Sequence, residues 1–119
     1  MPSPGQPLKT ALKLFDALNN SDIETAMSVY ADDAVLTHPF GRFEGKDAIK
    51  NFYAGTVLAA KTVLTVGATL EQGQACGVQL TAVSPQAPEH PQRAFDYIEV
   101  NADGLVAELS VYYLTNLAQ

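Results

Sequence analysis

The sequence has little of the chemistry that builds metal, disulfide or phosphate sites. Its 119 residues include one cysteine, Cys76, and only two histidines, which lie far apart. A single cysteine forms no internal disulfide and rules out a cysteine-based zinc site. No Gly-rich phosphate loop, His-x-x-x-His or Cys-x-x-Cys pair, or nucleophile elbow occurs. We therefore expect neither a metal nor a cofactor.

Positive charge is also scarce. The net charge is −6, and the seven Lys and Arg residues form no run. A phosphate-binding surface needs clustered basic side chains, so we expect no nucleic-acid and no membrane partner. No apolar run approaches membrane-spanning length, and residues 1–7 lack the features of a signal peptide. The simplest placement is the cytoplasm, with residues 1–7 as a disordered leader before a single domain over residues 8–119.

The first half of the chain has the period of amphipathic helices. From Leu8 onward, apolar residues recur at helical spacing and form a wide apolar face. Ser21, with Glu24 three residues later, is typical of a capping box. It predicts a second, shorter helix whose apolar stripe ends at Tyr30.

A short strand separates the second helix from a third. Residues 35–40 alternate, with Leu36, His38 and Phe40 on one face, and Pro39 confines the strand to an edge or an end. The third helix follows the turn at Gly45, and its apolar face consists of Ala48, Ile49, Phe52 and Tyr53.

The second half has the period of strands. Residues 62–71 and 75–84 alternate on either side of a hairpin turn, and residues 93–101 and 105–115 form two more strands. The expected inner face of the first strand is Leu64, Val66, Ala68 and Leu70, and that of the last is Leu105, Ala107, Leu109, Val111 and Tyr113. Residues 85–92 contain three prolines and no core residue, so we expect an exposed loop at the mouth of a pocket.

Three helices followed by a run of antiparallel strands predict an α+β fold, with the helices on one face of a curved sheet. A sheet that curls around helices leaves a cavity suited to a small ligand.

Asp96 is the most informative polar residue. Alternation over residues 93–101 places it on a face with Ala94, Ile98 and Val100. An aspartate aimed into an apolar interior must be paired or held neutral by a raised pKa, and both occur at active sites. The alternatives are a shifted register that leaves Asp96 solvated, or a bond to a buried backbone amide.

His38 poses the same question between Leu36 and Phe40. A lone histidine on an apolar face is often a satisfied core or edge residue, but its pKa suits proton transfer near neutrality. Two polar groups, His38 and Asp96, aimed at one apolar cavity make a stronger signal than either alone. Tyr30 and Tyr53 carry hydroxyls that need partners when buried, although packing alone accounts for Tyr30.

Three stretches carry a family resemblance: D-I-E-T-A-M-S-V-Y-A-D-D-A-V-L-T-H-P-F-G, then G-K-D-A-I-K-N-F-Y, and finally F-D-Y-I-E-V with a closing V-Y-Y. From Leu8 to Thr115 the chain resembles the ketosteroid isomerase branch of the nuclear transport factor 2-like (SnoaL-like) superfamily. The resemblance implies a cone-shaped α+β barrel, in which three N-terminal helices pack in a strongly curved, mostly antiparallel sheet and a deep apolar pocket lies between them.

In those isomerases a carboxylate base moves a proton between two carbons, while a tyrosine and a protonated aspartic acid hold the dienolate oxygen. Asp96 matches the protonated aspartic acid, and Tyr53 and Tyr30 match the supporting tyrosine network. His38 occupies the base position in place of aspartate, and Leu14 occupies the position of the oxyanion tyrosine.

The leading hypothesis is an isomerase of the steroid delta-isomerase type, with His38 as base, Asp96 as acid or oxyanion donor, and Tyr53 as its support. Cyclisation, dehydration and epoxide opening are alternatives, as is a non-catalytic protein that binds a small hydrophobic molecule. The expected substrate-binding residues are Leu14, Tyr30, Phe40, Phe52, Leu64, Val66, Ile98, Val111 and Tyr113. Phe95, Tyr97 and Tyr112 on the outer sheet face predict a homodimer.

Overall fold

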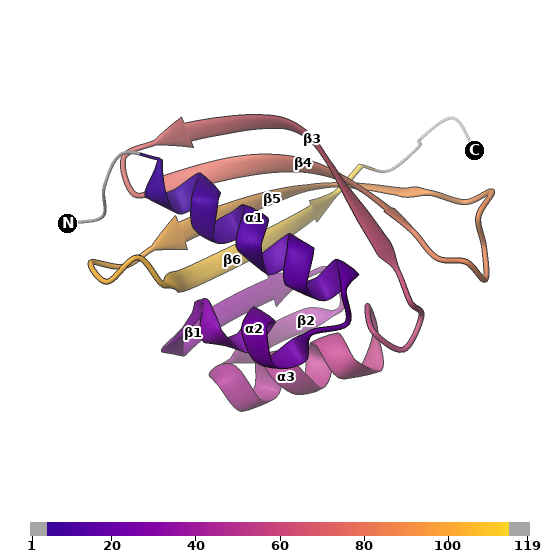
Figure 1. Cartoon of the computed structure of the whole chain (residues 1–119), viewed down its shortest axis with the longest axis horizontal. Coiled ribbons are helices and arrows are strands. Elements are labelled where there is room, and N and C mark those ends of the chain that lie inside the picture. Colours follow the sequence, from indigo (N-terminus) through magenta and orange to yellow (C-terminus); the bar gives the residue numbers. More distant parts are fainter. Residues whose placement is uncertain (1–4, 115–119) are drawn as a thin grey trace.

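The computed structural model of the chain describes residues 5–114, where three helices pack against one six-stranded sheet (Figure 1). The helices are α1 (Gln6–Asn19), α2 (Ile23–Ser28) and α3 (Lys46–Gly55). The strands are β1 (Tyr30–His38), β2 (Gly41–Glu44), β3 (Val63–Gln72), β4 (Ala75–Val83), β5 (Gln92–Val100) and β6 (Val106–Tyr113).

The sheet is mixed but mostly antiparallel. Its order is β2-β1-β6-β5-β4-β3, and only the β1–β6 pair is parallel. The sheet curls without closing, so β2 and β3 remain edge strands. α1 crosses the inner face of β3 to β6, while α2 and α3 lie by β1 and β2 (Figure 1). The predicted α+β fold with a strongly curved sheet is confirmed.

The hydrophobic core lies between α1 and the inner face of the sheet. Leu14 of α1, Leu36 of β1, Ile98 of β5 and Leu109 of β6 are all fully buried there or nearly so. Ile98 and Leu109 are directly opposed in the antiparallel β5–β6 register. This packing joins α1 to the middle strands of the sheet.

The second helix is shorter than the sequence predicts. Its N-cap is Asp22, whose carboxylate accepts a hydrogen bond from the Thr25 N–H, so the expected Ser21 capping box is wrong. α2 ends at Ser28, and Tyr30 already belongs to β1. The helix stops there because the Val29 carbonyl accepts a bond from Val106 at the start of β6.

A hairpin that the sequence pattern did not predict follows β1. β1 ends at His38, and Pro39 and Phe40 form the two-residue turn into β2, with His38 opposite Gly41. Phe40 therefore lies in the turn and not in the expected strand.

The N-terminus also differs from expectation. α1 begins at Gln6, inside the expected leader, because a proline is well tolerated in the first turn of a helix. Gly5 is the N-cap of α1, and residues 1–4 of the expected leader lie outside the described residues, as does Thr115 at the end of the expected last strand.

Two bulges change which side chains face inward. In β3 the register shifts between Val66 and Thr69, so Thr69 faces Val78 and Leu70 turns outward, 70% exposed. The expectation that Ala68 and Leu70 continue the inner face is therefore wrong.

A second register shift places Val106 opposite Val100 in the β5–β6 pair. Val106 is fully buried in the inner position expected for Ala107, while Leu105 packs against the core as expected. Alternation from a single strand cannot reveal such a bulge, because the extra residue has no signature of its own.

Candidate functional site

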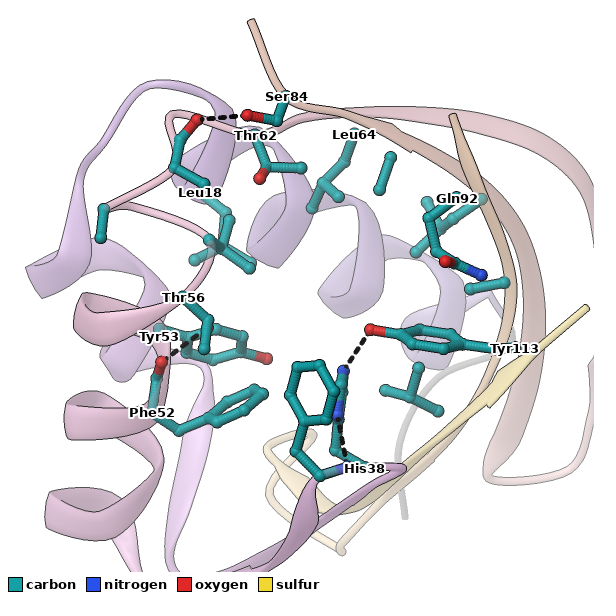
Figure 2. A pocket seen from close by; sticks show the side chains of 18 of the residues that line it. Leu18, His38, Phe52, Tyr53, Thr56, Thr62, Leu64, Ser84, Gln92 and Tyr113 are labelled. Carbon is teal, nitrogen blue, oxygen red and sulfur yellow. Dashed lines mark hydrogen bonds between the residues drawn. The ribbon is translucent and has the colours of Figure 1, made fainter. Parts of the chain in front are cut away.

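A cavity of about 580 Å³ opens between α1, α3 and the curled sheet. Side chains from both layers point into it, including Phe52 and Tyr53 of α3, Leu64 of β3 and Tyr113 of β6 (Figure 2). Residues 85–91 form a loop between β4 and β5, as predicted, and Gln86, Ala87 and His90 of this loop line the cavity. The volume is within the range of small-molecule sites.

Asp96 lies on the inner face of β5 and lines this cavity. Its neighbours across the sheet are Val78 on β4 and Val111 on β6, and it is 5% exposed. The predicted register is confirmed. Asp96 Oδ1 is the one buried side-chain N or O atom without a hydrogen-bond partner in residues 5–114.

The apolar surroundings decide the protonation state of this carboxyl. Burial raises the pKa of Asp96 from 3.8 to about 7, because removal from water penalises the carboxylate and no cation or donor compensates. At neutral pH the site therefore contains both the acid and its conjugate base in comparable amounts. A group of this kind can give up or accept a proton without a large energetic cost.

Tyr30 and Tyr53 form a hydrogen-bonded pair beneath the cavity. Their hydroxyl oxygens lie 2.5 Å apart, and Tyr30 is fully buried while Tyr53 lines the cavity. Tyr30 has no other acceptor in the described part of the chain, so its proton must go to the Tyr53 oxygen. The Tyr53 proton is then free for a ligand, and the Tyr53 ring carries its hydroxyl toward the cavity (Figure 2).

Both tyrosines stay protonated at neutral pH. Burial raises the pKa of Tyr30 well above its ordinary value, and the Tyr53 anion would add further repulsion. Burial likewise raises the pKa of Tyr53, with a smaller contribution from the nearby Asp96 charge. Tyr53 is therefore a hydrogen-bond donor to whatever occupies the cavity.

His38 faces the same cavity as Asp96 but bonds to other partners. Its Nε2 lies 2.7 Å from the Tyr113 hydroxyl, and its Nδ1 accepts a hydrogen bond from the Phe40 N–H at 3.1 Å. The ring also packs against Phe52, with centroids 4.8 Å apart. Burial lowers the pKa of His38, so the ring is neutral at pH 7.

The structure divides the expected substrate-binding residues into two groups. Those that line the cavity are Phe40, Phe52, Leu64, Val111 and Tyr113, although Phe40 is 72% exposed in its turn. Those outside the lining are Leu14, Tyr30, Val66 and Ile98. Leu14, Tyr30 and Ile98 fill the core below the cavity, and Val66 lines a separate hollow with Gln79 and Phe95.

Several lining residues were not anticipated. Phe15 and Leu18 of α1 reach the cavity instead of Leu14, because the helix turns a different part of its wide apolar face toward the opening. Thr56, Val57 and Thr62 come from the turn-rich segment after α3, which has no periodicity that could have predicted them. Among these unanticipated residues, only those on the apolar face of α1 could have been predicted from the sequence.

Residues 5–114 contain no group of three or more His, Cys, Asp or Glu side chains that could hold a metal ion. None of the helices in this part of the chain is long and apolar enough to cross a membrane. Cys76 is buried, and burial raises its pKa to about 11, so its thiol is unreactive at neutral pH.

Residues 11–109 match the model of the SnoaL-like domain. The chain belongs to the SnoaL-like family. This agrees with the resemblance in the sequence and with the α+β architecture. No curated protein matches the chain in sequence.

Solved structures from other organisms have the same fold as this SnoaL-like protein. One is a Kribbella flavida protein provisionally named a ketosteroid isomerase, with a TM-score of 0.82 and 23% identity over 93% of this chain and 79% of that chain. Another is RV0760c from Mycobacterium tuberculosis, in complex with estradiol-17beta-hemisuccinate, with a TM-score of 0.81 and 20% identity over 95% of both chains. A third, from Sinorhizobium meliloti, is provisionally named a polyketide cyclase, with a TM-score of 0.80 and 22% identity over 87% of this chain and 94% of that chain.

Proposed function

We propose that this SnoaL-like protein is an isomerase that moves a proton next to a carbonyl group of a small hydrophobic ring ketone or enone. The observation that carries the proposal is Asp96, which is the only carboxylate among residues 5–114 that lines the cavity. It is buried, Oδ1 has no partner, and its pKa of about 7 lets it both accept and return a proton.

The proposed reaction uses one group for both proton transfers. The Asp96 carboxylate removes a proton from the carbon next to the carbonyl, and the electron pair of that C–H bond forms an enolate. The enolate oxygen accepts a hydrogen bond from Tyr53, whose proton is free because Tyr30 donates to it. Protonated Asp96 then returns the proton to another carbon of the conjugated system, so substrate and product are isomers.

This assignment differs from the base role that the sequence suggested for His38. Nδ1 of His38 already accepts the Phe40 N–H, and Nε2 is bonded to Tyr113, so neither nitrogen has a lone pair free for a substrate carbon. Asp96 has no such competing bond.

The test is the isomerisation of a 3-keto-Δ5 steroid and of smaller enones, followed by the absorbance of the conjugated product. We expect Asp96→Asn to lower kcat/KM by at least about 10²-fold, the ordinary contribution of a general acid–base. Tyr53→Phe should lower it by on the order of 10²-fold, as for the loss of one oxyanion donor. Asp33→Asn, at an exposed carboxylate on β1, is the matched control. Equal rates in wild type and Asp96→Asn would refute the proposal.

The second candidate is a non-catalytic protein that binds a hydrophobic molecule in the same cavity. It is favoured by the protonated form of Asp96, which is a hydrogen-bond donor, and by the absence of a second free base among the described lining residues. A solved structure of this fold, RV0760c, holds a steroid ester. Tight binding of a steroid ketone without turnover would favour this candidate.

We also propose that the protein forms a homodimer through the outer face of the sheet. Phe95 and Tyr112 are opposed across the β5–β6 pair, and their side chains are 40% and 60% exposed. An apolar patch of this kind on an antiparallel sheet is typical of a protein interface.

A further inference from the structure

The pair formed by His38 and Tyr113 lies at the wall of the cavity opposite Tyr53. Tyr53 comes from α3 and Tyr113 from β6, and their hydroxyls point into the cavity from opposite sides (Figure 2). The rings of His38 and Tyr113 meet edge to face, with centroids 5.1 Å apart and an interplanar angle of 89°. Together with the 2.7 Å bond, this contact holds the tyrosine in one orientation.

The hairpin turn determines which nitrogen of His38 carries the proton. A neutral imidazole has one N–H and one lone pair. Nδ1 accepts the Phe40 N–H, in the manner of a polar side chain that bonds to the backbone two residues ahead in a turn. The lone pair is therefore on Nδ1, and the proton is on Nε2.

This tautomer fixes the direction of the bond to Tyr113. Because Nε2 carries the proton, it donates to the Tyr113 oxygen, and Tyr113 cannot donate in return. The Tyr113 hydroxyl proton then has no acceptor in residues 5–114. Tyr113 is half-buried, and both burial and the Asp96 charge raise its pKa, so the hydroxyl remains protonated beside the carboxyl.

We propose that Tyr113 donates a hydrogen bond to an oxygen acceptor of the bound molecule, and that His38 is the positioning residue that aims this donor. The inference rests on the proposed ligand, a hydrophobic ring compound, and adds that its carbonyl, ether or hydroxyl oxygen lies toward β6. The residue at the position of the usual carboxylate base thus serves recognition through Tyr113 instead of proton abstraction.

The first test needs no ligand and no turnover. Long-range ¹⁵N NMR of the intact protein at pH 7.5 reports the tautomer of each histidine. We expect His38 to carry its proton on Nε2 with Nδ1 unprotonated, while exposed His90 in the same sample serves as an internal reference. A His38 ring protonated on Nδ1 would overturn the inference, because Tyr113 would then donate to Nε2.

The second test measures selectivity for an oxygen atom. The ratio of affinities for 1-tetralone and for its hydrocarbon analogue tetralin should fall roughly 2- to 12-fold in Tyr113→Phe, the value of one hydrogen bond. Tyr112→Phe, the next residue on β6 but on the outer face, should leave the ratio unchanged. An unchanged ratio in Tyr113→Phe, with a fall only in Tyr53→Phe, would overturn the role of Tyr113.

The positioning role of His38 has its own pair of variants. The amide nitrogen of glutamine reaches the place of Nε2, whereas that of asparagine reaches only the place of Nδ1. His38→Gln should therefore keep the selectivity ratio and His38→Asn should lose it, by the same factor as Tyr113→Phe. Equal ratios in the two variants would refute the positioning role. These binding measurements stand even if Asp96 turns out to move no proton, so the two proposals fail separately.

Discussion

Replacement of Asp96 by asparagine should make the folded protein more stable than the wild type at pH 8. Asparagine has nearly the same shape as aspartate but stays neutral at every pH. The wild-type carboxyl must ionise in an apolar wall formed by Val78 and Val111, where Oδ1 has no partner. The substitution removes this cost and keeps the packing.

The sign and size of this stability difference follow from the pKa of Asp96, which is about 7 in the folded state against an ordinary value of 3.8. A carboxyl with a raised pKa holds its proton more tightly in the folded than in the unfolded chain. Below about pH 4 both states are protonated and the effect vanishes. As pH rises from 4 through 7 the wild type loses stability, and above 7 the loss levels off. A shift of about three units corresponds to about 4 kcal/mol, an upper value because relaxation and water reduce it.

The assay is urea unfolding followed by circular dichroism at intervals from pH 4 to pH 8.5. The difference in unfolding free energy between Asp96→Asn and wild type should be small at pH 4 and grow to a few kcal/mol by pH 8. Asp33→Asn, at an exposed position, should show no such growth. A wild type that is more stable than Asp96→Asn at pH 8 would mean that the carboxylate is paired in solution, and the reasoning would fail.

The remaining predictions concern stability and assembly. Tyr53→Phe should cost about 1–3 kcal/mol of unfolding free energy, since it leaves the buried Tyr30 hydroxyl without a hydrogen-bond partner, whereas Tyr30→Phe should cost less. If the losses of the two single variants, measured by urea unfolding, simply add in the double variant, the hydrogen bond between the two hydroxyls is contradicted. Gly77→Ala should cost about 1–3 kcal/mol, because a Cβ there would lie 2.3 Å from the Phe95 ring, and Phe95→Ala should relieve most of this cost. Light scattering at micromolar concentration should give twice the 12.7 kDa chain mass, and Tyr112→Glu should give a monomer; a monomeric wild type would rule out the dimer.

Much of the fold could be predicted because it depends on period and order. The clean alternation over residues 93–101 correctly placed Asp96 inward, since its neighbours Ala94 and Ile98 share that face. The order of elements predicted a curved sheet, and the family resemblance added how strongly it is curved, which no local pattern encodes. The position of α2 was predicted correctly, but its predicted end was too late in the chain. The hydrogen bond from the Val106 N–H to the Val29 carbonyl, which the local sequence does not show, ends the helix earlier.

The errors have a common physical origin. Leu70 and Ala107 were assigned to the inner face by counting, and each lies at or beyond a bulge that depends on the partner strand. Leu14 was expected in the pocket, but the choice between neighbouring positions on a wide apolar face depends on how α1 docks. Such relations between elements are absent from the local pattern.

The chemistry of His38 could not be predicted for the same reason. The sequence places His38 in a short strand, directly before Pro39. Its tautomer depends on the Phe40 N–H in the following turn and on Tyr113 from the far end of the chain. Those two bonds convert an expected base into a residue that orients another donor.

The most direct test of the central claim is hydrogen exchange at the carbon next to a ketone. 1-Tetralone incubated in deuterated buffer at neutral pH gains deuterium at that carbon, and NMR gives the rate. We predict that the wild type accelerates this exchange above the buffer rate and that Asp96→Asn reduces the acceleration at least about 10²-fold, while Asp33→Asn retains it. Binding of the ketone with no acceleration by the wild type, or equal acceleration by Asp96→Asn, would contradict proton transfer by Asp96.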